Sequence, residues 1–308
     1  MSALTGVVRR ARRWRPGRFP WSAPTWPAGL ERPAPERHLG VDYDSAWSRR
    51  YPARLVRAVV LDTVTRPVAH VVASPEVTGA EVLTLVEAPI IFVANHASHV
   101  DTPLLLSVLP ARFRHKTVVA AAADHFFDRR WKAHLWALAL AAIPIERHRV
   151  NRRSAELATE LVSEGWSLVI YPEGGRSHDG WFQPFRGGAA YLAARTGRPV
   201  VPVHIDGTWR VLPRGGSRVR RSPTRVSFGS PIVPDGEDAR RLEKRIETAL
   251  ATLADETRTD WWSARRRAAA GDTPSPRGPD VAGWRRAWAL GPGDHAGDDD
   301  ARWALERR

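Results

Sequence analysis

The 308-residue chain contains no cysteine, which excludes a disulfide framework and a thiol nucleophile and fits a reducing cytoplasm. It also lacks a long apolar run. The most apolar stretch, residues 131–143, is interrupted by Lys132 and His134 and falls short of the ~20 residues that a transmembrane helix needs. No apolar core follows the arginines of the first segment, so we expect neither a transmembrane helix nor a signal peptide.

Acidic residues are scarce relative to basic ones, 33 against 47, which gives a formal net charge of +14. Lysine is scarce as well. It occurs only at Lys116, Lys132 and Lys244, so arginine carries almost all of the positive charge. Such an excess attracts polyanions, and both nucleic acid and anionic membrane surfaces fit it.

Both ends of the chain differ from its middle. Residues 1–40 combine eight arginines and two glutamates with several prolines and tryptophans, a composition typical of disorder. This arm is either a solvated tail or a segment that adheres to anionic lipid, with arginine at the phosphates and tryptophan at the interface. Residues 271–308 are rich in Pro, Gly, Asp and Arg. We expect a disordered arm at 1–44, one folded domain at 45–262 and a disordered tail at 263–308.

The most informative stretch begins with an apolar run, residues 90–94, that stops abruptly at polar residues. This pattern predicts a strand buried on both faces, with polar side chains at its carboxyl end, where ligand sites of parallel sheets lie. His96 and Asp101 stand five positions apart, about 500° around a helix, so they cannot meet on one regular helix. They can meet if a helix begins between them, at Ser98 or His99. The carboxylate would then fix the imidazole tautomer and leave the other ring nitrogen as a general base.

Apolar segments near residues 91, 118, 168 and 201 alternate with helical patterns. This alternation predicts an α/β domain with a mostly parallel, helix-covered sheet. Further strands are expected at residues 68–72, 81–85 and 224–228, a helix at 131–143, and another helix capped by residues 235–238.

A glycine-rich turn, residues 172–177, follows the predicted strand at 166–171. Its two glycines permit backbone amides to approach an anion closely, and the Arg176 guanidinium can fork onto the anion's oxygens. The turn therefore suits a phosphate. An arginine-rich loop without acids, residues 214–225, is either solvated or a contact for headgroup or substrate phosphates.

The segment Asn95-His96-x-Ser98-x-x-Asp101 resembles the NHxSxxD block of the glycerolipid acyltransferases, the family of lysophosphatidic acid acyltransferase. Three more blocks resemble that family in the same order: residues 143–147, residues 171–177, which resemble FPEGTRS, and residues 201–205. Two positions depart from the family pattern. Tyr171 replaces Phe, and Gly175 stands where Thr or Ser is common, which removes a hydroxyl that would help to hold the acceptor.

The resemblance implies the glycerolipid acyltransferase fold and an O-acyltransferase that moves a fatty acyl group from acyl-CoA or acyl carrier protein to a lysophospholipid hydroxyl. The main acceptor would be 1-acylglycerol-3-phosphate, giving phosphatidic acid, with glycerol-3-phosphate or another lysolipid or aminolipid as alternatives. The implied catalytic pair is His96 and Asp101. The implied substrate-binding residues are Asn95, Ser98, Arg147, Glu173, Gly174, Gly175, Arg176 and Ser177.

The resemblance implies no metal and no cofactor besides the acyl thioester co-substrate. The expected partners are the lysophospholipid acceptor, the thioester donor and an anionic membrane surface, so we expect a cytoplasmic enzyme peripheral to the inner face of the plasma membrane. The apolar helix at 131–143 would pack in the core or form a wall for the acyl chain.

Three other hypotheses explain less of the sequence. A nucleic-acid-binding protein is a distant alternative that accounts for the charge but not for the four blocks. Ser98 as a nucleophile lacks the GxSxG elbow. His96, His99 and Asp101 lie within one turn and lack the further ligands that a metal site needs.

Overall fold

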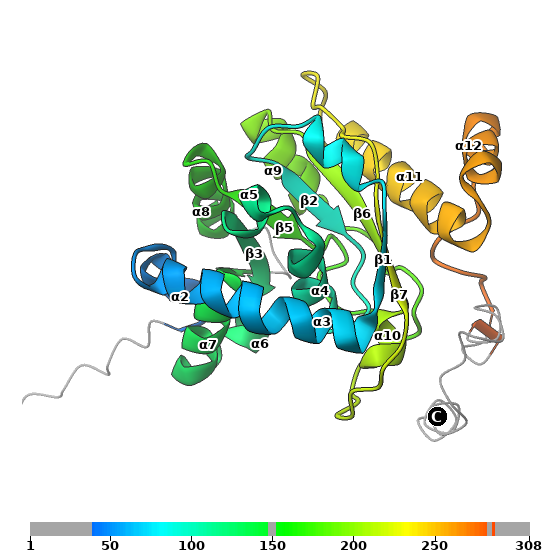
Figure 1. Ribbon diagram of the computed structural model, residues 1–308. Coiled ribbons are helices and arrows are strands. Elements are labelled where there is room, and N and C mark those ends of the chain that lie inside the picture. Colours follow the sequence, from blue (N-terminus) through cyan, green and yellow to red (C-terminus); the bar gives the residue numbers. More distant parts are fainter. Residues whose placement is uncertain (1–38, 147–151, 282–284, 287–308) are drawn as a thin grey trace, which may run out of the picture. The chain divides into compact units, whose positions relative to one another are not determined.

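The computed structural model describes residues 39–146, 152–281 and 285–286 (Figure 1). Its centre is a seven-stranded sheet in the order β1-β7-β6-β2-β5-β3-β4. The strands are β1 (Pro75–Thr78), β2 (Ile91–Ala94), β3 (Thr117–Ala122), β4 (Ala142–Ile145), β5 (Ser167–Ile170), β6 (Val200–Asp206) and β7 (Thr224–Phe228). Neighbouring strands pair in parallel, except β6 and β7, which pair antiparallel. The predicted mostly parallel α/β sheet is therefore confirmed.

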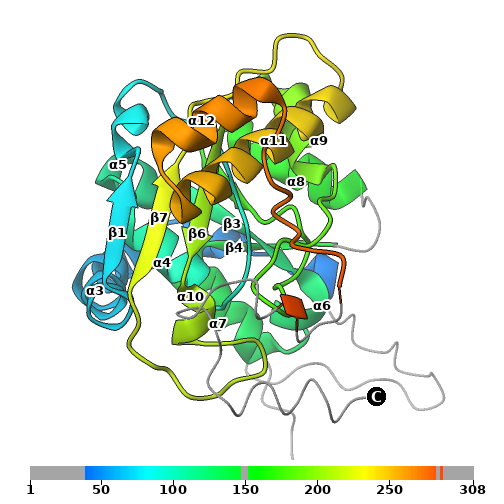
Figure 2. The ribbon, with the colours of Figure 1, turned by 90° about the vertical axis from the view of Figure 1, so that its right-hand side faces the viewer.

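Helices cover both faces of this sheet (Figures 1 and 2). They are η1 (Gly40–Asp42), η2 (Ala46–Arg49), α2 (Ala53–Val60), η3 (Leu61–Thr65), α3 (Arg66–Ala73), η4 (Ala80–Thr84), α4 (Asp101–Val108), α5 (Ala111–Arg114), α6 (Ala123–Phe126), α7 (Arg130–Leu140), α8 (Arg152–Ser163), α9 (Gly188–Thr196), α10 (Thr208–Val211), α11 (Ala239–Arg258) and α12 (Trp261–Ala270). Within the described ranges, every helix is too short or too polar to cross a lipid bilayer.

The side chains of β2 alternate between two hydrophobic cores. Ile91 and Val93 pack in the core that includes residues of α8, α9 and α11. Phe92 and Ala94 pack in the opposite core, which includes residues of α3 and α4. All four side chains are fully buried, which explains why this strand is an uninterrupted apolar run.

Two of the predicted strands are wrong. Residues 68–72 belong to α3, where the small side chains of Ala69 and Ala73 face the core and Val68 is exposed. The helical spacing of these buried alanines outweighs the β-propensity of the valines around them. Residues 81–85 fall on the 3₁₀ turn η4 and its end, and β1 is the strand of this region.

The predicted helix at 131–143 ends too late, and the sequence did not indicate the strand that follows it. Helix α7 stops after Leu140, because Ala141 adopts a left-handed conformation with φ 50°. Glycine is the usual residue at such a helix end, so an alanine gives no stop signal. The next residues form β4, which pairs with β3 at the sheet edge.

The predicted amino-terminal boundary at residue 45 is too late. Tyr43 is buried, and its ring lies 5.3 Å from that of Phe127. Residues 39–44 therefore belong to the folded domain. The rest of the predicted arm, residues 1–38, lies outside the described residues.

The predicted carboxyl-terminal boundary at residue 262 is too early, because α12 continues to Ala270. Asp260 caps this helix by accepting a hydrogen bond from the Ser263 amide. The Arg267 guanidinium holds the helix to α11 through two bonds to the Asp255 carboxylate, of 2.7 and 2.8 Å. Asp260 is a typical N-cap residue, so the sequence contained a signal for the start of α12. The arginine-rich composition that follows it favoured the prediction of a disordered tail instead.

Candidate active site

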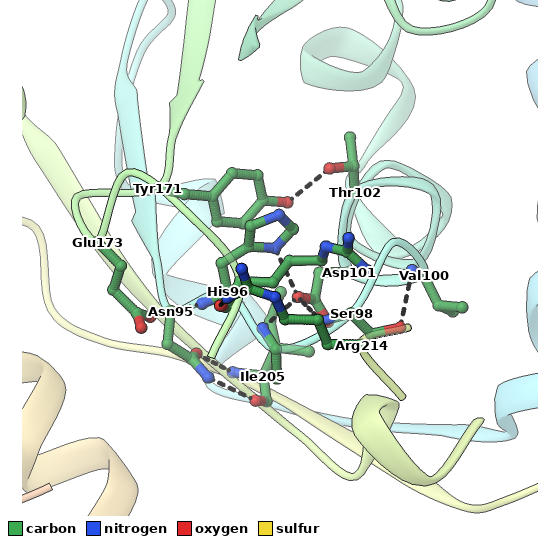
Figure 3. A network of polar contacts seen from close by, with 12 residues as sticks. Asn95, His96, Ser98, Val100, Asp101, Thr102, Tyr171, Glu173, Ile205 and Arg214 are labelled. Atoms are coloured by element: carbon green, nitrogen blue, oxygen red, sulfur yellow. Dashed lines mark hydrogen bonds and ion pairs between the residues drawn. The ribbon is translucent and has the colours of Figure 1, made fainter. Parts of the chain in front are cut away.

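The His96 imidazole and the Asp101 carboxylate meet at the carboxyl end of β2 (Figure 3). His96 Nδ1 lies 2.8 Å from Asp101 Oδ2. The same oxygen accepts hydrogen bonds from the amides of Ala97 and Ser98, at 2.7 and 2.8 Å. Asp101 is the first residue of α4 and is fully buried. The contact expected across a helix start is therefore present, with the helix beginning at Asp101 itself.

This geometry sets the chemistry of the imidazole. A carboxylate oxygen accepts hydrogen bonds, so the contact with Asp101 favours the His96 tautomer that has the hydrogen on Nδ1 and the lone pair on Nε2. The His96 side chain is 14% exposed, so Nε2 can reach a ligand. Its face stacks on Tyr171, with ring centroids 4.1 Å apart, and the Tyr171 hydroxyl is 2.8 Å from Thr102 Oγ1. The hydroxyl group, which the phenylalanine of the family pattern lacks, therefore links the Tyr171 ring to α4.

The Glu173 carboxyl group bonds to the backbone of His96. Its Oε1 accepts from the His96 amide and its Oε2 from the Gln183 amide, both at 2.7 Å. The side chain is only 5% exposed. Burial raises the pKa of Glu173 to about 8, against the opposing effect of the two amide hydrogen bonds. Both carboxyl oxygens of Glu173 thus bond to backbone amides, and its contact with substrate stays a prediction.

Asn95 and Ser98 are also engaged with the protein's own backbone. The Asn95 amide group donates to the Ile205 carbonyl and accepts from the Ile205 amide, at 2.8 and 2.7 Å. Ser98 Oγ donates to the Leu212 carbonyl at 2.8 Å and accepts from the Val100 amide at 3.1 Å. Both residues are buried and link the turn that carries His96 to distant backbone, and their contact with substrate stays a prediction.

Ser177 has the same kind of role. Its Oγ donates to the Trp181 carbonyl and its amide donates to the His96 carbonyl, each at 2.7 Å. The residue is buried, and its predicted contact with substrate stays a prediction. The backbone of His96 is thus fixed at its amide by Glu173 and at its carbonyl by Ser177.

The glycine-rich turn contributes the remaining predicted residues. Gly174 has φ 68°, and a Cβ there would approach the Arg186 guanidinium to 3.0 Å. Gly174, Gly175 and Arg176 line the same cavity as His96. Burial lowers the pKa of Arg176, and the nearby Arg214 adds to this effect. Arg147, also predicted to bind substrate, lies outside the described residues.

The cavity beside His96 has a volume of about 240 Å³, with charged and polar residues on one part of its lining and apolar residues on another. The polar lining residues include His96, His99, Thr102, His125, Tyr171, Arg176 and Arg214. The apolar ones include Val119, Ala120, Ala121, Ala122, Phe126, Trp136, Leu140, Ala142 and Ile145. Such a lining suits a molecule with an anionic head and an apolar tail.

Sequence reasoning missed several lining residues. His99 and His125, which no motif singled out as substrate-binding, stack with ring centroids 5.9 Å apart at the cavity. Burial, more than the neighbouring charge of Arg176, lowers the pKa of His99 to about 4, so this ring is neutral at pH 7. Arg214 was noted only as part of an arginine-rich loop. A loop composition does not show which of its arginines lines the cavity.

Comparison with known proteins agrees with this fold. The acyltransferase family model matches residues 74–206. The chain is 32% identical to a chloroplastic 1-acyl-sn-glycerol-3-phosphate acyltransferase of Brassica napus over 56% of this chain and 49% of that protein. It is 30% identical to a 1-acyl-sn-glycerol-3-phosphate acyltransferase of Cocos nucifera over 54% of this chain and 53% of that protein. The chain thus spans about half the length of these curated relatives.

A solved structure shows the same fold. The 1-acyl-sn-glycerophosphate acyltransferase PlsC of Thermotoga maritima superposes with a TM-score of 0.50 at 22% identity. The match covers 68% of this chain and 84% of that one. The likeness to the acyltransferase family thus covers residues 74–206, less than half of this chain.

Proposed function

We propose that the protein transfers a fatty acyl group from an acyl thioester to the free hydroxyl of 1-acylglycerol-3-phosphate, giving phosphatidic acid. The observation that carries this proposal is the position of the His96–Asp101 pair at a cavity that is cationic in one part and apolar in another. The names of the relatives, which describe acyl transfer to this acceptor, support it.

The reaction follows from the orientation of the imidazole. His96 Nε2 takes the proton of the acceptor hydroxyl as its oxygen bonds to the thioester carbonyl carbon. The tetrahedral intermediate then loses its carbon–sulfur bond, and the imidazolium returns the proton to the leaving thiolate. The Asp101 carboxylate offsets the charge of the imidazolium. No acyl-enzyme is formed.

The test is acyl transfer from radiolabelled oleoyl-CoA to 1-acylglycerol-3-phosphate in vesicles. We expect labelled phosphatidic acid. Oleoyl acyl carrier protein replaces the donor in a second arm, and glycerol-3-phosphate and lysophosphatidylcholine replace the acceptor in others. Transfer to one of these other acceptors alone would refute 1-acylglycerol-3-phosphate as the substrate, and the absence of transfer in every arm would refute the proposed reaction.

The acyl chain of the donor would occupy the apolar part of the cavity, which Trp136 and Leu140 of α7 line. Changing Trp136→Glu should reduce kcat/KM for oleoyl donors by ~10-fold or more relative to hexanoyl donors, because a carboxylate there opposes burial of the chain. Leu135→Glu is the matched control, since Leu135 is 49% exposed on the same helix and does not line the cavity. Equal chain-length profiles for Trp136→Glu and wild type would place the chain elsewhere.

An anionic membrane surface is the remaining proposed partner, and one helical segment suits it. Helices α2, η3 and α3 follow one another without a break and cross the front of the molecule in Figure 1. One side of this segment packs on the core through Leu61, Ala69 and Ala73. The other side is an exposed apolar face consisting of Leu55, Val56, Val59, Val60, Val64, Val68 and Val71.

The charges around this apolar face favour an anionic partner. Asp62 is the only acid of the segment, and it pairs with Arg114 at 2.9 Å and with His115 at 3.2 Å. Arg54 and Arg66 lie on the same segment. A contiguous exposed apolar face of this kind marks an interaction surface, and its basic flanks match anionic headgroups.

The triple change Val59→Asp, Val64→Asp and Val68→Asp should weaken binding to phosphatidylglycerol vesicles by on the order of 10²-fold, given about 1 kcal/mol per partly buried valine. Co-sedimentation measures the binding. Val233→Asp, at a valine that is 57% exposed outside this segment, is the control for added charge. Unchanged sedimentation of the folded triple variant would contradict the docking of this face.

A further inference from the structure

Two guanidinium groups from distant parts of the chain line the cavity that holds the base. Arg176 comes from the glycine-rich turn after β5, and Arg214 comes from the loop after α10. Arg214 Nη1 donates to the Arg176 carbonyl at 2.6 Å and to His178 Nε2 at 2.7 Å. Figure 3 draws Arg214 in the same polar network as His96 and Asp101.

Neither guanidinium has a carboxylate partner within the described part of the chain. This differs from arginines elsewhere on the surface, such as Arg225, which bonds to Glu76. Burial is the main cause that lowers the pKa of Arg176, and the positive charge of the nearby Arg214 lowers it further. A bound anion would offset the positive charge of both groups.

The loop that carries Arg214 is tied to the catalytic turn. Ser98 Oγ donates to the carbonyl of Leu212, two residues before Arg214. A turn follows, in which the Gly216 amide donates to the Pro213 carbonyl at 3.0 Å and Gly215 has φ 83°. The serine of the NHxSxxD block thus positions the loop, and through it Arg214, relative to His96.

We propose that Arg214 is a second phosphate-binding arginine, which with Arg176 clamps the phosphate monoester of the acceptor beside the base. This inference rests on the proposed function for the identity of the acceptor. Two guanidinium groups present enough donors for several oxygens of one phosphate. A thioester donor of the coenzyme A type also carries phosphates, so the experiment has to separate the two sources.

The experiment compares Arg214→Gln with Arg218→Gln, a change of equal charge at an exposed arginine of the same loop that does not line the cavity. Arg214→Gln should raise KM for 1-acylglycerol-3-phosphate by about 10- to 100-fold, as expected for loss of a charge-assisted hydrogen bond. The kcat should change less, and kcat/KM for monoacylglycerol, which lacks the phosphate, should stay unchanged. Arg218→Gln should behave as wild type.

Two further readouts make the result unambiguous. If only KM for oleoyl-CoA rises, the arginine binds the donor, and the acceptor clamp is overturned. If KM for both substrates stays unchanged in an active, folded variant, the inference is overturned as well. Titration calorimetry with glycerol-3-phosphate tests binding without turnover: loss of binding in Arg214→Gln alone supports the clamp even if the acyl-transfer proposal fails.

Discussion

Replacing His96 by alanine should lower kcat/KM for acyl transfer by ~10² to 10⁴, the usual contribution of a general base. The side chain contacts Asp101 and Tyr171 and is otherwise directed at the cavity, so its removal deletes the proton acceptor and little packing. The assay is transfer of radiolabelled oleate to 1-acylglycerol-3-phosphate, together with a thermal melt to show that the variant is folded.

His70→Ala is the matched control for this experiment. His70 is exposed on α3, and its Nδ1 bonds only to the Arg66 carbonyl of its own helix, at 2.9 Å. Its variant should keep wild-type activity. A folded His96→Ala enzyme with the same rate as His70→Ala would rule out the base assigned here.

The second large effect is expected at Asp101, where Asp101→Asn should lower activity by ~10² or more while the domain stays folded. Asparagine keeps the shape of the side chain but not the charge that balances the imidazolium. Its amide oxygen can still accept from the Ala97 and Ser98 amides, so the variant isolates the loss of charge.

Asp101→Ala separates catalysis from stability at the same position. It leaves the buried amides of Ala97 and Ser98 without their acceptor, so it should destabilise the fold by about 1–3 kcal/mol for each amide. Asp101→Asn should destabilise much less. The two variants should therefore differ clearly in denaturant midpoint, and similar midpoints would contradict the bracing role of the carboxylate.

Prediction from the sequence was most accurate for elements whose own residues show a clear hydrophobic pattern. The run from Ile91 to Ala94 has no polar interruption because both faces of β2 are buried, and the contact of His96 with Asp101 follows from local helix geometry. Strand β4 was not predicted, because its pairing with β3 is a long-range effect and Ala141 gives no stop signal.

Among the residues predicted for the site, His96, Gly174, Gly175 and Arg176 line one cavity, whereas Asn95 and Ser98 bond to distant backbone. A sequence motif specifies which residue types follow one another. The direction of each side chain also depends on backbone from distant parts of the chain. Asn95 and Ser98 are occupied by Ile205 and Leu212, which lie more than a hundred positions along the chain. Arg214 lies nine positions after the last block, in a loop whose arginines share one composition, so the sequence did not single it out as the arginine at the cavity.

The antiparallel pairing of β6 and β7 has a consequence for how this fold can diversify. Because the chain reverses after β6, the connection between these strands returns to the edge where β2 delivers His96. Arg214 and the loop around it are therefore carried by a connection whose two ends are fixed in the sheet. Insertions or deletions there would reshape the headgroup region of the cavity without displacing a strand. On the proposed function, acceptor preference would change by exchange of this loop beyond Leu212, while the bond of Leu212 to Ser98 and the His96–Asp101 pair are retained.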